Sequence, residues 1–436
     1  GDFIGGFAPG MKFRDSIAEG RTDIPRAEIE AEVLEVARDL LARDPARLDA
    51  AWRDRVEVVQ GDAASASAME GFLAGVDAAY YLLHSMDGSG DFARRDRELA
   101  ETFAAAARAG GVHRIVYLSG LHPRGEALSP HLASRVEVGD VLLGSGVPTA
   151  VLQAGVVLGR DSASFRMLRH LTERLPVAVG PKWLSSRIQP IALEDVVYYL
   201  VRAAELAPDV NRTFDLGMPE TMTYAAMMRR YAKAAGLAPR LIGTVPVLTP
   251  SLASHWVSFI TPVPGGVARP LVGSLVHDAV RREHDAEGIL GTPPGGLTGF
   301  DEAVRRALGD DDPKRWGRTL AATTAGVAAA AVAGSLLTDP SSAWYRRLRK
   351  PAWQPPAAAF PVVWTALYAT VAVASAATIH ELTEDGKKPD ADAFARALAA
   401  NLVLNAGWSG LFFRVHRLVP ATLGAAALAA SSADLA

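Results

Sequence analysis

Two side chains able to do acid–base and ion-pairing chemistry stand four residues apart, at the ends of the segment from His131 to Arg135. In a helix this spacing puts both side chains on one face. An imidazole transfers protons near neutral pH, whereas an arginine side chain does not titrate and acts as a cation. A neighbouring cation would lower the pKa of the histidine. The pair therefore indicates either a proton-transfer site or a binding helix that has lost its catalysis.

Polar residues also follow short apolar segments, which we expect to be strands, in the first half of the chain. These segments are 56–59, 76–83, 114–118 and 149–152, with a helix from Phe92 that ends at Gly110-Gly111 and carries Leu99 and Phe103 on one face. Strands that alternate with helices predict an α/β Rossmann-like, doubly wound parallel sheet. Ligands of such sheets lie at the carboxyl ends of the strands. The pairs at those ends are Gly61-Asp62, His84-Ser85 and Ser119-Gly120.

The last third of the chain combines aromatic and amide side chains with long apolar segments. The ligand-binding candidates are Trp353, Trp364, Tyr368, Asn405 and Trp408. Together they would give an apolar cavity a few polar groups, which suits a flat, mostly hydrophobic ligand. Alternatively, Trp344 and Trp353 are interfacial aromatics that only anchor helices. Asn405 is costly inside a membrane span unless it is paired.

Charge separates the chain into two parts. The whole chain of 436 residues has a formal net charge of −3, but the part from Pro313 onward carries +5 and the part before it −8. Zero cysteines exclude disulfides, iron–sulfur clusters, cysteine-based zinc sites and thiol nucleophiles. The sequence contains no His-Glu-x-x-His, no Walker loop and no basic–aromatic interleaving, so we expect no metal and no nucleic acid.

Four charge-free segments in the second part predict an all-α transmembrane helix bundle. They are residues 319–338, 351–379, 397–413 and 418–433, with basic residues and aromatics at their ends. About 20 apolar residues are needed to cross a bilayer, so the first two qualify, the third is borderline and the fourth is short. The alternative is a buried bundle of alanine-rich helices in a soluble domain.

Three segments of the second part resemble the TspO/MBR family of tryptophan-rich sensory and translocator proteins. They are WYRRLRKPAWQPP (344–356), FPVVWTALY (360–368) and LNAGWSGLFF (404–413). The resemblance implies a five-helix bundle that binds a tetrapyrrole such as a porphyrin or, in some members, a sterol, with a homodimer through the membrane module as a further expectation. Four spans are expected here, and a missing fifth would open one wall of the cavity.

The first part resembles atypical short-chain dehydrogenase/reductases of the NmrA-like and complex-I-subunit-like branch. The resemblance rests on AGGVHRIVYLSGLHP (109–123), SPHLASRVEVGDVLL (129–143) and RIQPIALEDVVYYL (187–200). It implies an NAD(P)-binding oxidoreductase, in which Ser119 matches the catalytic serine and Arg135 holds the nicotinamide ribose. His131 and Arg135 stand where these enzymes have tyrosine and lysine.

The same resemblance implies the residues that hold the dinucleotide. Arg43 would meet the 2′-phosphate of NADP(H), which favours NADP(H) over NAD(H), although a solvated loop charge explains Arg43 equally well. Asp62 would contact the adenine, and His84 and Ser85 would lie along the pyrophosphate or ribose. Gly5 and Gly6 look like the tail of a glycine-rich phosphate-binding turn whose preceding strand is absent. Residues 29–40 have the spacing of an amphipathic helix where the family has a strand.

Residues 1–308 are therefore expected to form the nucleotide domain, 309–317 a linker and 318–436 the membrane domain. We expect an integral protein of a bacterial inner membrane, with the nucleotide domain in the cytoplasm. The leading hypothesis is an NADPH-dependent reductase with His131, Ser119 and Arg135 at the hydride-transfer site. The alternatives are a non-catalytic redox or ligand sensor, and an assembly factor of a membrane complex.

Overall fold

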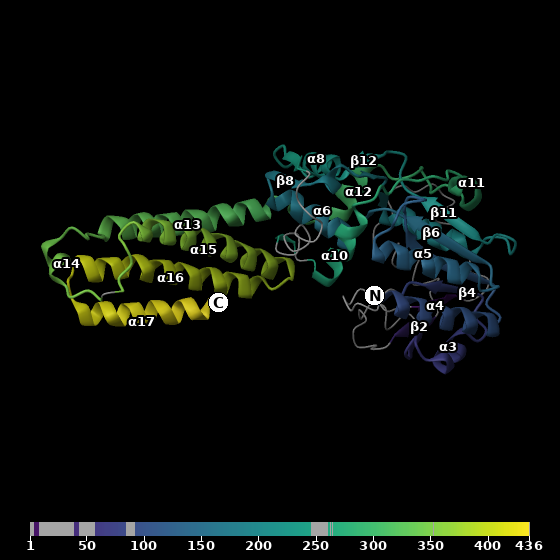
Figure 1. Ribbon diagram of the computed structural model, residues 1–436, viewed down its shortest axis with the longest axis horizontal. Coiled ribbons are helices and arrows are strands. Elements are labelled where there is room, and N and C mark those ends of the chain that lie inside the picture. Colours follow the sequence, from purple (N-terminus) through teal and green to yellow (C-terminus); the bar gives the residue numbers. More distant parts are fainter. Residues whose placement is uncertain are drawn as a thin grey trace. The chain divides into compact units, whose positions relative to one another are not determined.

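The structure, a computed structural model, consists of two compact units, Gly1–Asp311 and Asp312–Ala436 (Figure 1). The residues that it describes are 4–7, 39–42, 57–83, 92–245, 260–261, 263, 265–351 and 353–435.

A seven-stranded sheet forms the centre of the first unit, in the order β11-β6-β5-β4-β1-β2-β3. Its strands are β1 (Ile4–Phe7), β2 (Asp39–Ala42), β3 (Glu57–Gln60), β4 (Ala78–Tyr81), β5 (Arg114–Gly120), β6 (Thr149–Ala154) and β11 (Arg212–Leu216). All neighbours are parallel except β1, which is antiparallel to both β2 and β4. The predicted parallel sheet is confirmed, with β1 as the exception.

Helices cover both faces of the sheet, as expected of a doubly wound fold. On one face α3 (Ala66–Leu73), α4 (Phe92–Ala109) and α5 (Pro130–Leu143) enclose a core that includes Tyr81 and Tyr117. On the other face α7 (Leu193–Ala204) and α11 (Ala286–Leu290) pack against Val116, Leu152 and Phe214. Strand residues alternate between the two cores because successive side chains point to opposite faces.

The buried face of α4 differs from the one that the apolar residues predict. Phe103 is fully buried, but Phe92 and Leu99 are only partly buried, and the helix buries Asp96 and Ala100 instead. The Ser134 hydroxyl on α5 donates a 2.9 Å hydrogen bond to Oδ2 of Asp96. A buried carboxylate is tolerated where it is hydrogen-bonded, and this contact explains how an acid replaces an apolar residue on that face.

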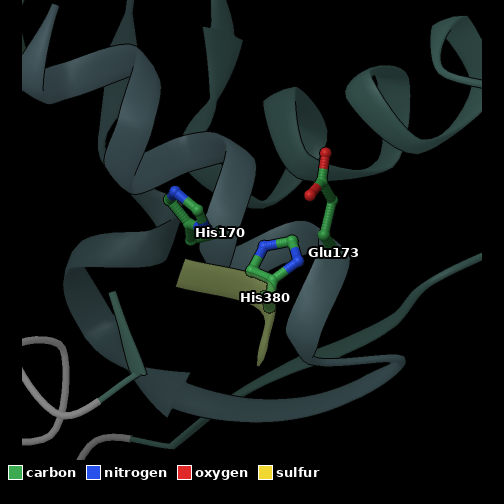
Figure 2. A group of neighbouring side chains, drawn as sticks. All are labelled: His170, Glu173 and His380. Atoms are coloured by element: carbon green, nitrogen blue, oxygen red, sulfur yellow. The ribbon is translucent and has the colours of Figure 1, made fainter. Parts of the chain in front are cut away.

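The remaining elements of the first unit form a second lobe around their own apolar core. They are β7 (Val157–Leu158), α6 (Ala163–Arg174), β8 (Val177–Pro181), η2 (Lys182–Ser185), β9 (Arg187–Ile188), β10 (Ile191–Ala192), β12 (Met222–Thr223), α8 (Tyr224–Ala234), β13 (Leu241–Val245), α10 (Gly265–Ser274) and α12 (Phe300–Leu308). Helix α6 carries His170 and Glu173 near its end (Figure 2). The Tyr231 hydroxyl donates to Oε1 of Glu173 at 2.6 Å and joins α8 to α6.

Asp195 lies in the first turn of α7 and is almost fully buried. Its two carboxylate oxygens accept hydrogen bonds from the Thr298 backbone amide at 2.8 Å and from the Thr298 hydroxyl at 3.1 Å. Burial outweighs these bonds and raises the pKa of Asp195 to about 6.

We expect Asp195 to make the first unit less stable as the pH rises from about 4 to above 6. The folded protein holds the proton of Asp195 more tightly than the unfolded chain does. The stabilisation that this proton provides is therefore complete below the pKa of Asp195 in the unfolded chain, and it is lost as the pH rises through the pKa in the folded protein. Asp195→Asn removes this titration. The fall in the urea midpoint of unfolding between pH 4 and pH 7 should therefore be smaller in the variant than in the wild type, and an equal fall would contradict the assignment.

The second unit is helical, with α13 (Arg315–Leu337), α14 (Ala343–Arg347), α15 (Ala359–Glu384), α16 (Lys388–Phe413) and α17 (Leu418–Asp434). Helix α13 packs against α15 and α16, and α16 also packs against α15 and α17. Residues 315–317, which the sequence places in the linker, belong to the first turn of α13. Helix α15 begins at Ala359, after the loop that contains Pro351, Pro355 and Pro356.

Two of these helices, α13 and α15, are long and apolar enough to cross a membrane, and α17 is a shorter apolar helix. Many large apolar side chains of this unit are exposed. Among the described residues they include Val332, Leu336, Val362, Val403, Val419 and Leu423. These exposed apolar side chains and the two long apolar helices are consistent with a helical membrane module.

Candidate functional site

The predicted catalytic residues lie together at the carboxyl end of β5. Ser119 is the penultimate residue of β5, and His131 and Arg135 lie in the first two turns of α5, which begins after the N-cap Ser129. The guanidinium Nη1 of Arg135 donates to the Leu118 carbonyl at 3.0 Å, next to Ser119. Thus Arg135 contacts the end of the strand, and His131 contacts Arg135.

Arg135 also determines the hydrogen-bonding state of His131. Its Nε–H donates to Nε2 of His131 at 3.4 Å. An imidazole nitrogen that accepts a hydrogen bond carries no proton, so the neutral ring keeps its proton on Nδ1. Giving up that proton would leave an imidazolate, so this tautomer is a poor proton donor. The geometry therefore favours an orienting role over the proton transfer that the sequence suggests.

A buried polar group behind this pair was missed by the sequence analysis. The Tyr117 hydroxyl donates to the Arg135 carbonyl at 3.3 Å, and its ring lies edge-on to Tyr81 at 5.8 Å between centroids. Burial raises the pKa of Tyr117, against the opposing effect of the Arg135 charge. Tyr117 stays protonated and ties the strand to α5. The sequence could have indicated Tyr117, because residues two apart on a strand point to the same face of the sheet and Tyr117 stands two residues before Ser119.

The residues expected to hold the dinucleotide are described only in part. Asp62 follows β3 and is exposed, and its Oδ1 accepts the backbone amide of Ala64 at 3.0 Å. Arg43, His84 and Ser85 lie outside the described residues.

Gly5 and Gly6 do not form a turn, which corrects the sequence-based prediction. Both lie inside β1, where Gly5 pairs with Leu40 of β2 on one side and with Tyr80 of β4 on the other. Strand pairing on both edges requires an extended segment, because each neighbour must exchange backbone hydrogen bonds with it. Leu40 likewise lies in a strand and not in the predicted helix, since β2 pairs in parallel with β3.

In the second unit, Tyr368 of α15 and Asn405 of α16 are joined directly. The Tyr368 hydroxyl donates to Oδ1 of Asn405 at 2.9 Å. Trp364, one turn before Tyr368, lies with its ring 5.5 Å from the tyrosine ring. The pairing predicted for Asn405 is therefore present, and it places an aromatic and amide cluster between two helices.

The two other tryptophans of the predicted set are arranged differently. Trp408 donates its indole N–H to the Ala421 carbonyl of α17 at 3.0 Å and stacks on Phe412 at 5.4 Å. Its polar atom thus connects two helices. Trp353 is 82% exposed in the loop before α15, apart from the cluster of Tyr368 and Asn405. Its exposure agrees with the interfacial alternative.

Comparison with known proteins divides the chain at the same place. Residues 28–142 match the NAD(P)H-binding family model, and residues 322–436 match the TspO/MBR family model. Curated relatives of the second segment are Protein CrtK of Rhodobacter capsulatus, 36% identical over 76 residues, and the tryptophan-rich protein TspO of Chlorobaculum tepidum, 39% identical over 82 residues. These matches cover 17% and 19% of this chain, and 46% and 50% of the relatives, so the chain spans about half the length of the curated relatives it matches.

Solved structures resemble the first unit in fold. The triphenylmethane reductase of Citrobacter sp. has a TM-score of 0.50 at 16% identity, and an NADPH-dependent quinone oxidoreductase of Escherichia coli has a TM-score of 0.50 at 19% identity. Each match covers 64% of this chain and 94% of the other. The chain thus joins a Rossmann-type sheet domain, whose residues 28–142 match the NAD(P)H-binding family model, to a helical domain, whose residues 322–436 match the TspO/MBR family model.

Proposed function

We propose that this protein is a membrane-tethered, NADP(H)-dependent reductase whose TspO/MBR domain binds a flat hydrophobic ligand of the tetrapyrrole kind. The observation that carries the proposal is the convergence of Ser119, His131 and Arg135 at the carboxyl end of β5, within an NAD(P)H-binding domain. In open α/β sheets ligands bind at this edge.

Each of the three residues has a distinct task in this proposal. When bound, NADPH supplies a hydride. Arg135, held by the Leu118 carbonyl, provides a fixed cation for the nicotinamide ribose. Ser119 provides a hydroxyl donor beside it, and His131, which accepts the Nε–H of Arg135, helps to orient the bound groups. Arg43 supports the preference for NADP(H), because a cation after the second strand suits a 2′-phosphate.

We expect the full chain, in lipid vesicles, to bind NADPH and to oxidise it in the presence of a quinone. His131→Ala should lower kcat/KM roughly 100-fold, because a positioned hydrogen-bonding group beside the reacting atoms is lost. Binding is measured by NADPH fluorescence and turnover by NADPH absorbance. Unchanged turnover in His131→Ala would remove the role that we assign, and absence of NADPH binding would contradict the proposed function itself.

A second candidate function is a sensor that binds NADP(H) without turnover. The observation that favours it is that His131 and Arg135 stand in place of a titrating tyrosine–lysine pair. Arg135 does not titrate, and His131 accepts a hydrogen bond from Arg135. NADPH binding with no substrate-dependent oxidation would support the sensor over the reductase.

The exposed apolar surface of the second unit supports insertion into a bilayer through α13 and α15. We propose the inner membrane of a bacterium, with the first unit in the cytoplasm, where NADP(H) is found. Because the chain has no cysteine, single cysteines introduced in the loop at Ser341 report the sidedness by labelling with a membrane-impermeant thiol reagent. Labelling from the cytoplasmic side would contradict this orientation.

Tyr368→Phe is expected to weaken porphyrin binding about tenfold, because the variant lacks the hydroxyl that donates a hydrogen bond to Oδ1 of Asn405. The readout is porphyrin quenching of tryptophan fluorescence. Thr370→Val on the same helix is the matched control, since its hydroxyl bonds only to the Ala366 carbonyl of its own helix. Equal quenching in Tyr368→Phe and wild type would place the ligand elsewhere.

A further inference from the structure

Ser119, Gln153 and Asp215 are three polar residues in one row across the carboxyl edge of the sheet. The role proposed above for Ser119 does not involve Gln153 or Asp215. Ser119 of β5 is in register with Gln153 of β6, and Gln153 is in register with Asp215 of β11. Residues in register on parallel strands point to the same face, with neighbouring strands about 4.8 Å apart. We call Ser119, Gln153 and Asp215 the polar row. Gln153 and Asp215 are both buried, where apolar residues would be expected.

A cation, Arg282, lies over two members of this row. Its Nη2 donates to Oε1 of Gln153 at 3.2 Å, and its Nε donates to Oδ2 of Asp215 at 3.4 Å. The backbone amides of Arg282 and Glu283 donate to the same Asp215 oxygen, at 2.8 and 3.2 Å. Two guanidinium contacts and two backbone contacts therefore hold Arg282 beside Gln153 and Asp215.

The arrangement leaves one donor and one acceptor unused. Nη1 of Arg282 and Oδ1 of Asp215 are buried and have no hydrogen-bond partner within the part of the chain that the structure describes. Buried polar atoms are rarely left unsatisfied, since each costs about 1–3 kcal/mol. At the carboxyl edge, where ligands of such sheets bind, these two atoms are the groups that a polar ligand atom would satisfy.

His122 belongs to the same edge of the sheet. It follows β5 by two residues, is half-buried, and its Nδ1 lies 3.1 Å from the Gly120 carbonyl oxygen. A carbonyl only accepts, so Nδ1 carries a proton and Nε2 is the atom that can exchange one. Burial lowers the pKa of His122, with further lowering by Arg282 and Arg124 and opposition from the Gly120 carbonyl and Asp215.

We propose that the polar row and Arg282 receive the oxygen atom of a carbonyl substrate, and that His122 exchanges the proton with that oxygen. This inference rests on the proposed reductase function and names its substrate class. Asp215 neutralises Arg282, so the site suits a neutral carbonyl, such as a quinone or an aldehyde, better than a carboxylate. Arg282 then meets negative charge only as it develops in the transition state.

The reaction balances with groups already named. The carbonyl carbon accepts a hydride from NADPH, which is oxidised to NADP⁺, and the carbon–oxygen π electrons move onto the oxygen. The oxygen is stabilised by Nη1 of Arg282 and takes a proton from Nε2 of protonated His122. His122 takes up one proton (H⁺) from the solvent, so that the net reaction consumes NADPH, one proton and the carbonyl, while its Nδ1–H remains bonded to Gly120 in both states. The products are NADP⁺ and an alcohol, and the hydroxydienone that a quinone gives in this way tautomerises to the hydroquinone.

The test measures NADPH affinity and kcat/KM for benzoquinone and benzaldehyde on the full chain in lipid vesicles. Arg282→Met should lower kcat/KM roughly 100- to 1,000-fold, as expected when an oxyanion donor is removed. Arg282→Lys should lower kcat/KM less, because lysine keeps the positive charge beside Asp215. This variant also serves as the test if Arg282→Met does not fold. His122→Gln should lower kcat/KM roughly 100-fold. NADPH affinity should stay within about twofold in all three variants. Arg305→Met is the matched control, because Arg305 is exposed and forms an ion pair with Glu302.

The outcomes separate this inference from the proposed function. Normal turnover in Arg282→Lys and His122→Gln overturns the inference and leaves the reductase intact. Loss of NADPH affinity in these variants also overturns it, because the residues would then serve the nucleotide or the fold. If the wild type binds NADPH but reduces neither carbonyl compound, both the proposed substrate class and the proposed reductase function are wrong. If the wild type does not bind NADPH, the proposed NADP(H) binding is wrong as well.

Discussion

Asp215→Ala is expected to lower the free energy of unfolding of the first unit by about 3–5 kcal/mol, the cost typical of breaking a buried, hydrogen-bonded ion pair. Asp215 is 1% exposed, and its Oδ2 accepts the two backbone amides and the Nε–H of the Arg282–Glu283 segment. Alanine would leave these donors and the guanidinium charge without their acceptor. Removing one partner costs more than the pair itself contributes, because the remaining charge stays desolvated.

The measurement is pulse proteolysis of the full chain over a range of urea concentrations, with the midpoint converted to free energy through the slope. Asp301→Ala is the matched control. Asp301 also pairs with an arginine, Arg230, at 3.1 Å, but its side chain is 47% exposed, so about 0–1 kcal/mol is expected. Equal losses in the two variants would mean that burial of Asp215 does not determine its contribution.

Arg135→Met is expected to lower kcat/KM for NADPH-dependent reduction roughly 100- to 1,000-fold, in the range seen when a fixed donor at a reacting centre is removed. The change removes the hydrogen bonds to the Leu118 carbonyl and to Nε2 of His131. The histidine then loses the contact that selects its tautomer. Arg135→Lys should recover only part of the rate, because a point charge does not reproduce two fixed N–H directions.

A double-mutant cycle with His131→Ala tests whether the two residues act as a unit. Since Arg135 donates to His131, the double variant should be hardly slower than the slower single variant, with a coupling of about 0.5–3 kcal/mol. Rates are measured as initial NADPH oxidation at saturating NADPH. Strictly additive effects would show that the 3.4 Å contact has no part in catalysis.

The fold class could be predicted because its indications are local. The apolar segments that became β3, β4, β5 and β6, and the charge-free segments that overlap α13 and α15, each carry their pattern within a short stretch of chain. The i, i+4 spacing of His131 and Arg135 was likewise sufficient to put both on one side of α5. In the second unit, the cost of an amide in an apolar helix predicted that Asn405 has a partner.

Other features depended on contacts between distant segments. The placement of Gly5 and Gly6 in β1 depends on β2 and β4, which supply hydrogen bonds from both sides. The burial of Asp96 depends on Ser134, 38 residues further along the chain. Neither partner is visible in the local pattern, so the glycine pair suggested a turn and nothing in the sequence indicated that Asp96 is buried.

The sequence by itself therefore determined that this chain joins a soluble-type α/β domain to a charge-poor helical one, because hydrophobic periodicity and charge are properties of short segments. Only the tertiary structure decided which polar atoms meet. Strand register brings Ser119, Gln153 and Asp215 into one row although 96 residues of chain separate the first from the last, and Arg282 reaches that row from 67 residues beyond Asp215. Register and tertiary contact are set by the packing of the whole domain, which no local spacing specifies.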